Sequence, residues 1–294
     1  MSRNKAKPTP RAAQAATLCM AANALLAAAK FAAAVLGRSA ALLSDAADSA
    51  ADVLTALFVR IALQISAKEA DSDHPYGHER FESISSLLLA ALMSFGALRI
   101  GLEALRSLLA GTAQTPSALA LAAALVSVAA KLLLSRYAKR AAARFDAPAL
   151  ADAAANYRTD SASSLFAAVG IAGSVLGAPF LDAAAGCIIC IGTLRSAAEI
   201  FRGATDALVD RACNEQTQQL ICSTALSVPG VCSVKKLLTR RFGNRIYVEL
   251  EITANGSITL RQAHDIAELV HDAVEETLPQ TKHCTVHVEP AEQH

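Results

Sequence analysis

Long apolar runs, separated by short polar segments, occupy the first two thirds of the chain. Six of these runs are long enough to be membrane spans, because an α-helix needs about 20 apolar residues to cross a bilayer. They cover approximately residues 14–36, 40–65, 81–109, 117–136, 151–176 and 180–201. The pattern predicts a polytopic α-helical membrane protein in which residues 1–204 form a six-helix transmembrane bundle.

The pattern changes after about residue 205, and residues 205–294 are polar enough to form a small separate domain. Apolar residues occupy every second position from Ile246 to Ile252, which is typical of a half-buried strand. The predicted elements are helices at 215–227 and 260–278 and strands at 231–241, 245–253 and 283–289, with a turn at 242–244. Their order predicts a small α+β (α-β-β-α-β) domain.

Composition favours a membrane protein over a soluble one. Of the 294 residues, 53% are hydrophobic and only 18% are charged, and the mean hydropathy is +0.36. Soluble domains carry about 25% charged residues. The net charge of +1 gives no electrostatic basis for binding nucleic acid. The seven cysteines are odd in number and scattered, which argues against a disulfide framework.

Basic residues cluster in two segments that flank the predicted spans. These are Arg3, Lys5, Lys7 and Arg11 before the first span, and Arg136, Lys139, Arg140 and Arg144 in a predicted loop between the fourth and fifth spans. The connections after the first, third and fifth spans carry only Arg38. By the positive-inside rule, we expect both termini and the 66–80 loop in the cytoplasm, with the bundle in the plasma (inner) membrane. No clear cleavage site for a signal peptide is present.

The second predicted span contains three aspartates. Asp45, Asp48 and Asp52 recur every three or four residues, so they share one face of a helix. A carboxylate at the centre of a bilayer costs at least about 2.5 kcal/mol. Three of them therefore require a cation, protons or a water-filled path. The competing interpretation is a soluble buried helix with an acidic edge, or N-capping by Asp45, and the membrane-like remainder of the chain disfavours it.

The fifth predicted span carries a second polar pair at the same spacing. Asn156 and Asp160 are four residues apart and therefore share a helix face. If the second and fifth spans pack together, these two residues with Asp48 and Asp52 predict a cage of four oxygen ligands. The alternative is that Asn156 and Asp160 lie near the cytoplasmic end and are solvated. Three further charged residues are expected near helix ends or paired within the bundle: Arg99, Glu103 and Lys131.

The segment 71–80 after the second span combines acidic and imidazole side chains. His74 and His78 are four residues apart, and Asp71 precedes them. Histidine is a common ligand of transition metals, so the spacing indicates a metal site in this loop. An acidic, solvated loop is the competing account.

Together these motifs resemble the cation diffusion facilitator family. The resemblance rests on the Asp-x-x-x-Asp of the second span, on His-Pro-Tyr-Gly-His-Glu-Arg-Phe-Glu at 74–82, on Asp160 and on the α-β-β-α-β domain. It implies a homodimeric exporter that exchanges a divalent transition metal for protons, with an Arg80–Asp210 pair holding the dimer. The metal ligands that it implies are Asp48, Asp52, Asn156 and Asp160 in the transport site, Asp71, His74 and His78 in the loop, and His264, His287 and Glu289 in the cytoplasmic domain.

The chain departs from the zinc-transporting members at one ligand position. Those members usually place a histidine where this chain has Asn156. Zinc favours nitrogen and sulfur ligands, whereas carboxylate and amide oxygens suit manganese or iron(II). We therefore expect Mn2+ or Fe2+ as the substrate, with Zn2+ as a further candidate. In the cytoplasmic domain, Lys235 and Glu249 stand where zinc-binding members can have histidines, so we expect one reduced metal site at most.

The predicted function is efflux of a divalent transition-metal cation across the plasma membrane in exchange for protons. This is secondary active transport and not an enzyme activity: the sequence has no nucleophile elbow, phosphate loop or HExxH motif. We expect no permanent cofactor. The expected partners are a second copy of the chain, the lipid bilayer, the cation and protons, without nucleic acid. The alternative is a non-transporting membrane sensor or scaffold that stabilises a partner transporter.

Overall fold

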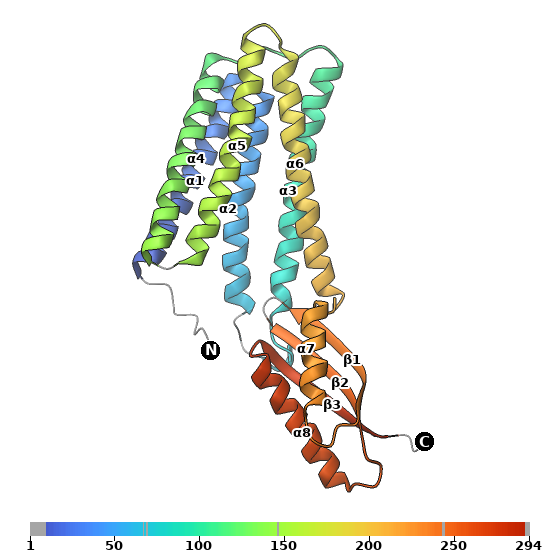
Figure 1. The fold of residues 1–294 in the computed structure, drawn as a ribbon. Coiled ribbons are helices and arrows are strands. Elements are labelled where there is room, and N and C mark those ends of the chain that lie inside the picture. Colours follow the sequence, from blue (N-terminus) through green and yellow to red (C-terminus); the bar gives the residue numbers. More distant parts are fainter. Residues whose placement is uncertain (1–9, 67, 69, 146, 243–244, 292–294) are drawn as a thin grey trace. The chain divides into compact units, whose positions relative to one another are not determined.

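The computed structural model describes residues 10–66, 68, 70–145, 147–242 and 245–291. This part of the chain contains eight helices and three strands (Figure 1). The chain divides into two compact units. One unit comprises Met1–Arg60 and Leu88–Ile200, and the other comprises Ile61–Leu87 and Phe201–His294.

Six long helices follow one another along the first two thirds of the chain. They are α1 (Pro10–Gly37), α2 (Ala40–Ser66), α3 (Arg80–Leu109), α4 (Ala118–Phe145), α5 (Pro148–Val175) and α6 (Phe180–Leu208). By length and composition, α1, α2, α3, α4 and α6 can each cross a membrane, so the chain is a multi-pass membrane protein. Helix α5 is as long but is not among these five, and its span stays a prediction.

The basic segment after the fourth predicted span is helical. Arg136, Lys139, Arg140 and Arg144 were expected in a loop, and this expectation is wrong, because α4 continues to Phe145. An apolar stripe sustains the helix: Ala138, Ala141 and Ala142 are buried, and the last two pack with Ala12 and Ala15 of α1. Helix α5 then begins at Pro148, whose fixed φ suits the first helical position.

Small residues let the long helices approach one another closely. A Cβ on Gly170 of α5 would lie 2.4 Å from the Cβ of Ala185 on α6. A Cβ on Gly186 of α6 would lie 3.0 Å from the carbonyl oxygen of Ala40 on α2. In a lipid environment such close backbone packing replaces the hydrophobic effect as the force that holds helices together. The side chains of α2 and α5 are thereby held within one tightly packed bundle.

The C-terminal domain has the predicted α-β-β-α-β order. Its elements are α7 (Glu215–Leu226), β1 (Ser233–Phe242), β2 (Arg245–Ala254), α8 (Leu260–Thr277) and β3 (Thr281–Pro290). The strands form one sheet in the order β1-β2-β3, antiparallel between β1 and β2 and parallel between β2 and β3. The predicted turn at 242–244 includes residues 243 and 244, which lie outside the described residues.

The core of this domain confirms the alternating pattern of β2. One face of the strand is buried against α7 and α8, and its core residues are Ile246, Val248, Leu250 and Ile252. Tyr247 points to the other face, where a polar surface was expected, yet it is only 5% exposed. Its hydroxyl donates a hydrogen bond to the carbonyl of Tyr76, 3.1 Å away, so the 71–80 loop covers that face. Lys282 of β3 donates to the same carbonyl at 2.9 Å.

The environments of the cysteines predict an order of reactivity. Cys232 is exposed, whereas Cys284 of β3 is 2% exposed and burial raises the pKa of its thiol to about 12. Because the thiolate is the reactive form, N-ethylmaleimide at pH 7.5 should modify Cys232 first and Cys284 only after denaturation. Mass spectrometry of peptides from the intact protein measures this order. Cys232→Ser should remove the fast phase, and fast labelling of Cys284 would contradict the strand placement.

Candidate metal site

The acidic stripe of α2 does not face a single partner. The structure distributes Asp45, Asp48 and Asp52 among three different helices that pack against α2. Each carboxylate meets a side chain that can donate a hydrogen bond or offset its charge. The three aspartates therefore have separate roles, although their spacing on the helix is the same.

Asp45 forms a closed ion pair in the bundle. Its Oδ2 lies 2.7 Å from Nζ of Lys30 on α1, and both side chains are at most 2% exposed. The ammonium also donates to the hydroxyls of Ser49 and Ser164, at 3.0 and 2.9 Å, and Ser164 donates to Asp45 Oδ1 at 3.0 Å. This network joins α1, α2 and α5. It supplies the counter-charge that the sequence left open for the first aspartate of the stripe.

Asp48 faces helix α6. The hydroxyl of Thr193 has one hydrogen to share between two acceptors, Asp48 Oδ1 at 3.0 Å and the Ile189 carbonyl at 3.2 Å. A donor that is itself anchored one turn back on its helix fixes the orientation of the carboxylate. A carboxylate has two oxygens, so a metal ion could bind Asp48 through Oδ2 while Thr193 holds Oδ1.

Asp52 and Asp160 meet at one buried ammonium. Nζ of Lys131, in the middle of α4, lies 2.5 Å from Asp160 Oδ2 on α5 and 3.7 Å from Asp52 Oδ2 on α2. Asp52 Oδ2 accepts no hydrogen bond from any described residue. The structure therefore brings carboxylates of α2 and α5 to the same position. Lys131, which was expected near a helix end or paired within the bundle, is paired there and is 0% exposed.

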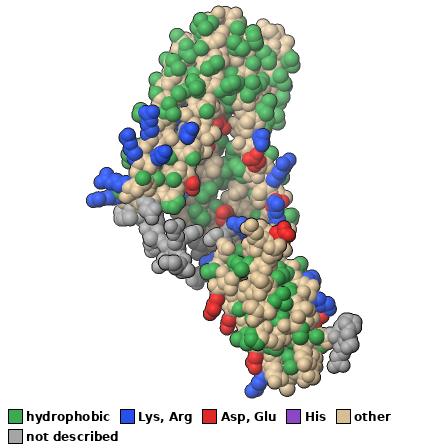
Figure 2. Space-filling view, viewed as in Figure 1, with side chains coloured by type: hydrophobic (Ala, Val, Ile, Leu, Met, Phe, Trp, Pro, Cys, Tyr) green, Lys and Arg blue, Asp and Glu red, His purple; other side chains and the backbone are tan. Residues whose placement is uncertain are grey.

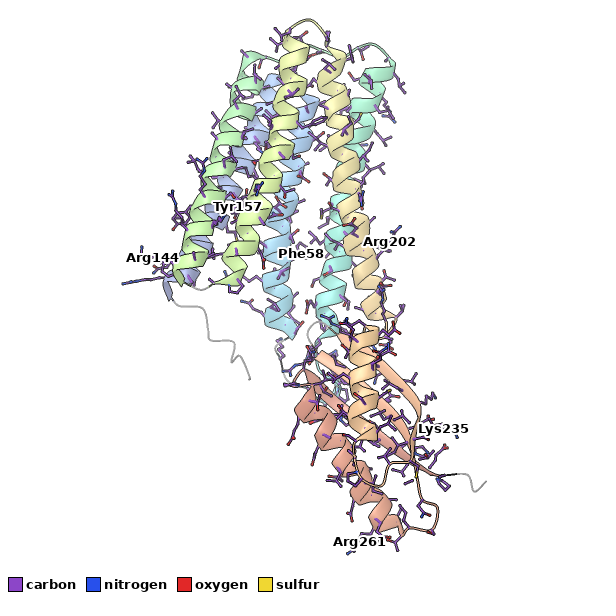
Figure 3. All side chains as sticks on the ribbon, in the orientation of Figure 1. Phe58, Arg144, Tyr157, Arg202, Lys235 and Arg261 are labelled. Carbon is purple, nitrogen blue, oxygen red and sulfur yellow. The ribbon has the colours of Figure 1, made fainter. Side chains whose placement is uncertain are left out.

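Asn156 and Tyr157 occupy the turn of α5 before Asp160. Asn156 is an exposed residue, in contrast to Asp160, which is 8% exposed. Tyr157, labelled in Figure 3, packs with Cys19 of α1 and Ala138 of α4. Its ring centroid lies 5.7 Å from Nζ of Lys131, within the range of a cation–π contact. The tyrosine therefore forms one wall beside the ammonium.

The loop between α2 and α3 brings its three predicted ligands together. In the described residues, Asp71, His74 and His78 are the group whose possible metal-ligand atoms all lie within 4.8 Å of one another. His74 Nδ1 lies 3.2 Å from Asp71 Oδ1, and His78 Nε2 lies 3.4 Å from Asp71 Oδ2. The two imidazole rings are 4.5 Å apart between centroids. One carboxylate and two imidazoles at this separation can bind a transition-metal ion.

Local backbone geometry orients this cluster. Asp71 Oδ1 accepts the backbone N–H of His74 at 2.7 Å, and this hydrogen bond lowers the pKa of the Asp71 carboxyl from its ordinary value. Gly77 has φ of +93°, a conformation that side chains rarely adopt, and it turns the chain between the two histidines. The Nδ1 atom of His78 is buried and has no hydrogen-bond partner in the described part of the chain. The pair implied for the dimer, Arg80 and Asp210, is 3.2 Å apart within one chain.

The three predicted ligands of the C-terminal domain are not gathered into such a cluster. His264 on α8 lies 3.8 Å from Glu268, and its side chain is 68% exposed. His287 lies 3.7 Å from Glu289 on β3. Lys235 donates a hydrogen bond to Glu289 at 2.5 Å, and this bond lowers the pKa of that carboxyl. The lysine thus occupies an oxygen that the sequence assigned to a metal.

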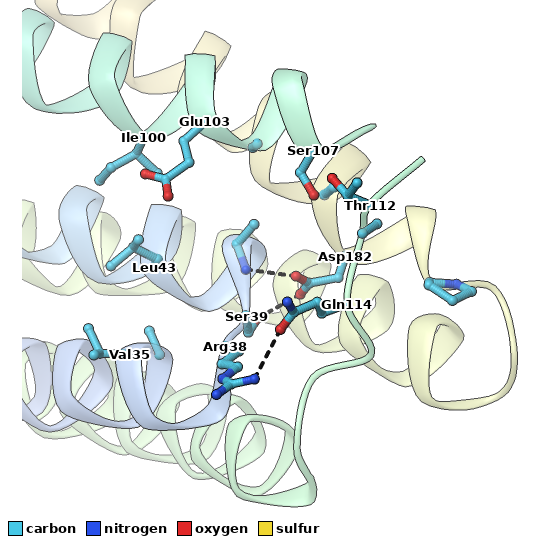
Figure 4. Close-up of a pocket in the computed structure, with 16 residues that line it drawn as sticks. Val35, Arg38, Ser39, Leu43, Ile100, Glu103, Ser107, Thr112, Gln114 and Asp182 are labelled. Carbon is cyan, nitrogen blue, oxygen red and sulfur yellow. Dashed lines mark hydrogen bonds between the residues drawn. The ribbon is translucent and has the colours of Figure 1, made fainter. Parts of the chain in front are cut away.

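A cavity of about 440 Å³ lies at the end of the bundle where α1 ends and α2 begins (Figure 4). Asp182 of α6 lines it, and its carboxylate accepts the hydroxyl of Ser39 at 2.6 Å and the backbone N–H of Ala40 at 2.7 Å. These bonds cap the first turn of α2. Glu103 lines the same cavity, and Arg38 beside it donates to Gln114 at 3.3 Å. Asp182 therefore serves the helix terminus.

Sequence reasoning missed two groups of the acidic site. Lys131 was recognised as a charge within a span, but no partner was assigned to it. Thr193 carries no sequence signal, because a threonine in an apolar helix is common. An ionisable residue inside a membrane span normally marks a function or an ion pair, and this rule would have selected Lys131.

Two sequence families match almost the whole chain. The family described as the cation efflux transmembrane domain matches residues 16–209, and the family described as the cation efflux protein, cytoplasmic domain, matches residues 213–291. Both families therefore describe cation efflux proteins, and their matches follow one another along the chain.

Individual proteins are similar over at least three quarters of their length. The chain is 33% identical over 270 residues to the uncharacterized transporter YdbO of Bacillus subtilis, covering 90% of this chain and 91% of that protein. It is 34% identical to the magnetosome protein MamM of Paramagnetospirillum magneticum (82% and 76% covered) and 28% identical to the manganese efflux system protein MneS of Bacillus subtilis (95% of both). A solved nickel form of the MamM C-terminal domain covers 27% of this chain at 33% identity, with a TM-score of 0.27.

The closed Lys30–Asp45 pair predicts a stability effect that a second substitution should reverse. Lys30→Met leaves the Asp45 charge buried without its partner, and breaking a buried ion pair in this way costs about 3–5 kcal/mol. We expect a clear drop in the temperature at which the purified protein loses its folded peak on size exclusion. Adding Asp45→Asn should restore most of that loss. Equal melting of Lys30→Met and the wild type would contradict the pairing.

Proposed function

This chain belongs to the cation diffusion facilitator family, and from that premise we propose that it exports a divalent transition-metal cation. One observation carries the proposal: α2 and α5 direct the carboxylates of Asp52 and Asp160 to a single buried position. That position already accommodates a positive charge, the ammonium of Lys131. A metal ion there would meet carboxylates from two helices, with Asp48 and Asn156 one turn away on each helix as the remaining ligands.

The donor set supports manganese or iron(II) as the preferred substrate. All four proposed ligands bind through oxygen, and hard oxygen ligands suit Mn2+ better than the nitrogen and sulfur ligands that zinc favours. The similar protein MneS is named a manganese efflux system protein, which agrees with this choice. Zinc remains a candidate, because the intrinsic affinity order of divalent metals places Zn2+ above Mn2+ in most sites.

Protons are the proposed counter-ion. The cation enters the cage from the cytoplasm, and rearrangement of the bundle opens the cage to the other side. Protons then compete with the metal for the same carboxylate oxygens, and their binding lowers the metal affinity. When the cage opens to the cytoplasm again, the carboxylates release these protons there. This exchange requires no separate proton pathway, because ligand and proton acceptor are the same atoms.

The proposed topology has six spans and cytoplasmic termini. Helix α5 would be the sixth span, because it packs between its neighbours by the close contact at Gly170 and carries Asp160 into the bundle interior. Exposed basic residues gather at the end of α4 (Figure 2), namely Arg136, Lys139, Arg140 and Arg144. By the positive-inside rule that end would face the cytoplasm, in the plasma membrane.

A homodimer with an accessory metal site in its loop completes the proposal. Asp71, His74 and His78 supply a mixed oxygen and nitrogen set that can hold the same cation. The C-terminal domain would mainly dimerise, since Lys235 pairs with Glu289 and leaves at most a weak site at His264 and His287. No permanent cofactor is proposed.

Flux through purified, reconstituted protein tests the function. We expect Asp52→Asn to keep the fold, because the amide has the same shape, and to reduce Mn2+ flux at least about tenfold. Mutation of a residue that only hydrogen-bonds to a metal ligand typically reduces metal affinity or activity by about 10–100-fold, and loss of a ligand should cost at least as much. Asp152→Asn makes the same chemical change at an exposed aspartate of α5, so it is the control and should transport normally. Metal binding by the wild type without any flux would favour the sensor or scaffold instead.

A second experiment tests the choice of metal. Asn156→His replaces a neutral amide oxygen by a neutral imidazole nitrogen, which zinc binds at about 2.0–2.1 Å. The ratio of initial zinc flux to initial manganese flux should rise severalfold at one pH, while the formal charge of the site is unchanged. An unchanged ratio would assign metal selection to the loop cluster of Asp71, His74 and His78.

A further inference from the structure

Lys131 is placed at the centre of the proposed transport site. Its side chain is 0% exposed, and its ammonium contacts the carboxylates of Asp160 and Asp52. The Tyr157 ring, 5.7 Å away, is on the same α5 helix as Asp160. Helices α2, α4 and α5 thus converge on one positive charge held by the side chains proposed as metal ligands.

We propose that Lys131 is a tethered counter-cation of the transport site, which occupies the cage between metal ions and is displaced when a divalent cation binds. This inference rests on the proposed function and adds to it a residue that determines affinity and charge selectivity. The ammonium of a lysine is a compact positive charge at the end of a flexible four-carbon chain. It needs to move only far enough to give up its contacts with the two carboxylates.

A second buried lysine in the same bundle shows what a purely structural pair looks like. Lys30 has Asp45, Ser49 and Ser164 around its ammonium, and the side chains of the ion pair are at most 2% exposed. The Lys131 site differs in its exposure. The Asp52 side chain is 28% exposed, whereas the Asp45 side chain is 2% exposed, so the Lys131 site is open on one side.

Charge arithmetic explains why such a residue would be useful. The carboxylates of Asp48, Asp52 and Asp160 carry three negative charges and Lys131 carries one positive charge, so the site has a formal charge of −2. A dication offsets this charge, whereas a monovalent ion leaves the site negative and gains too little to displace a tethered ammonium. The returning ammonium also weakens the hold on the metal, which favours release. The Tyr157 ring already lies within cation–π range of the ammonium while Lys131 contacts the carboxylates.

Equilibrium binding to the purified full-length protein tests the inference. Lys131→Met removes the charge and keeps an unbranched side chain one atom shorter, and the Kd for Mn2+ measured by titration calorimetry should fall at least about tenfold. This is the size of one hydrogen bond to a charged group. Lys131→Arg keeps the charge and should bind Mn2+ within about threefold of the wild type. Lys30→Met, the matched control, should lose stability but leave the Kd unchanged.

Transport adds a readout that a structural role would not move. In vesicles, Lys131→Met should show a lower KM for Mn2+ together with a lower kcat, because tighter binding slows release. If the methionine variant does not fold, Lys131→Gln, which is also neutral, is held to the same Kd criterion. A Kd that is unchanged or weaker in the neutral variant overturns the inference, even when the wild type transports Mn2+. Absence of divalent-cation binding and flux in the wild type would instead overturn the proposed function.

Discussion

The compensation of buried charge is the constraint on which the transmembrane unit depends. Carboxylates and ammonium groups are costly inside a helical bundle in a membrane, and they persist only when they are paired. Among the residues that the structure describes, the bundle has two buried lysines, Lys30 and Lys131, and each lies within 4 Å of an aspartate of α2. These pairs tie α1, α4 and α5 to α2. Because the aspartates of α2 are costly to bury without a positive charge, the helices that carry Lys30 and Lys131 must lie beside α2.

The two pairs differ in how completely the surrounding side chains enclose them. The Lys30–Asp45 pair is enclosed by serine hydroxyls and fixes the position of α2 relative to α1 and α5. Asp182 caps the first turn of the same helix from α6. These contacts fix the first turns of α2, from Ala40 to Asp45. The carboxylates of Asp48 and Asp52 therefore follow a fixed helical segment, and a metal site with defined geometry requires such a rigid support. The Lys131 cluster lies within this frame and remains open at Asp52.

The second unit connects the loop cluster to the sheet of the C-terminal domain. Tyr247 and Lys282 both donate hydrogen bonds to the carbonyl of Tyr76, and Lys282 also pairs with Glu79. The loop that carries His74 and His78 is therefore held between these contacts on β2 and β3. A tyrosine on the face of β2 opposite the core, which strand periodicity alone would leave in solvent, is buried because the loop covers it.

The sequence alone determined the helices, the α-β-β-α-β domain and the family, because hydrophobic periodicity and the spacing of Asp48, Asp52, His74 and His78 are local properties of the chain. It also identified Asp160 as a partner for the second span. Only the tertiary structure decided that Lys131 lies between Asp52 and Asp160, that Lys30 neutralises Asp45, and that the basic segment after residue 136 extends α4. These ion pairs join residues 15 to 79 positions apart and depend on helix packing, and no local pattern encodes which helices pack together.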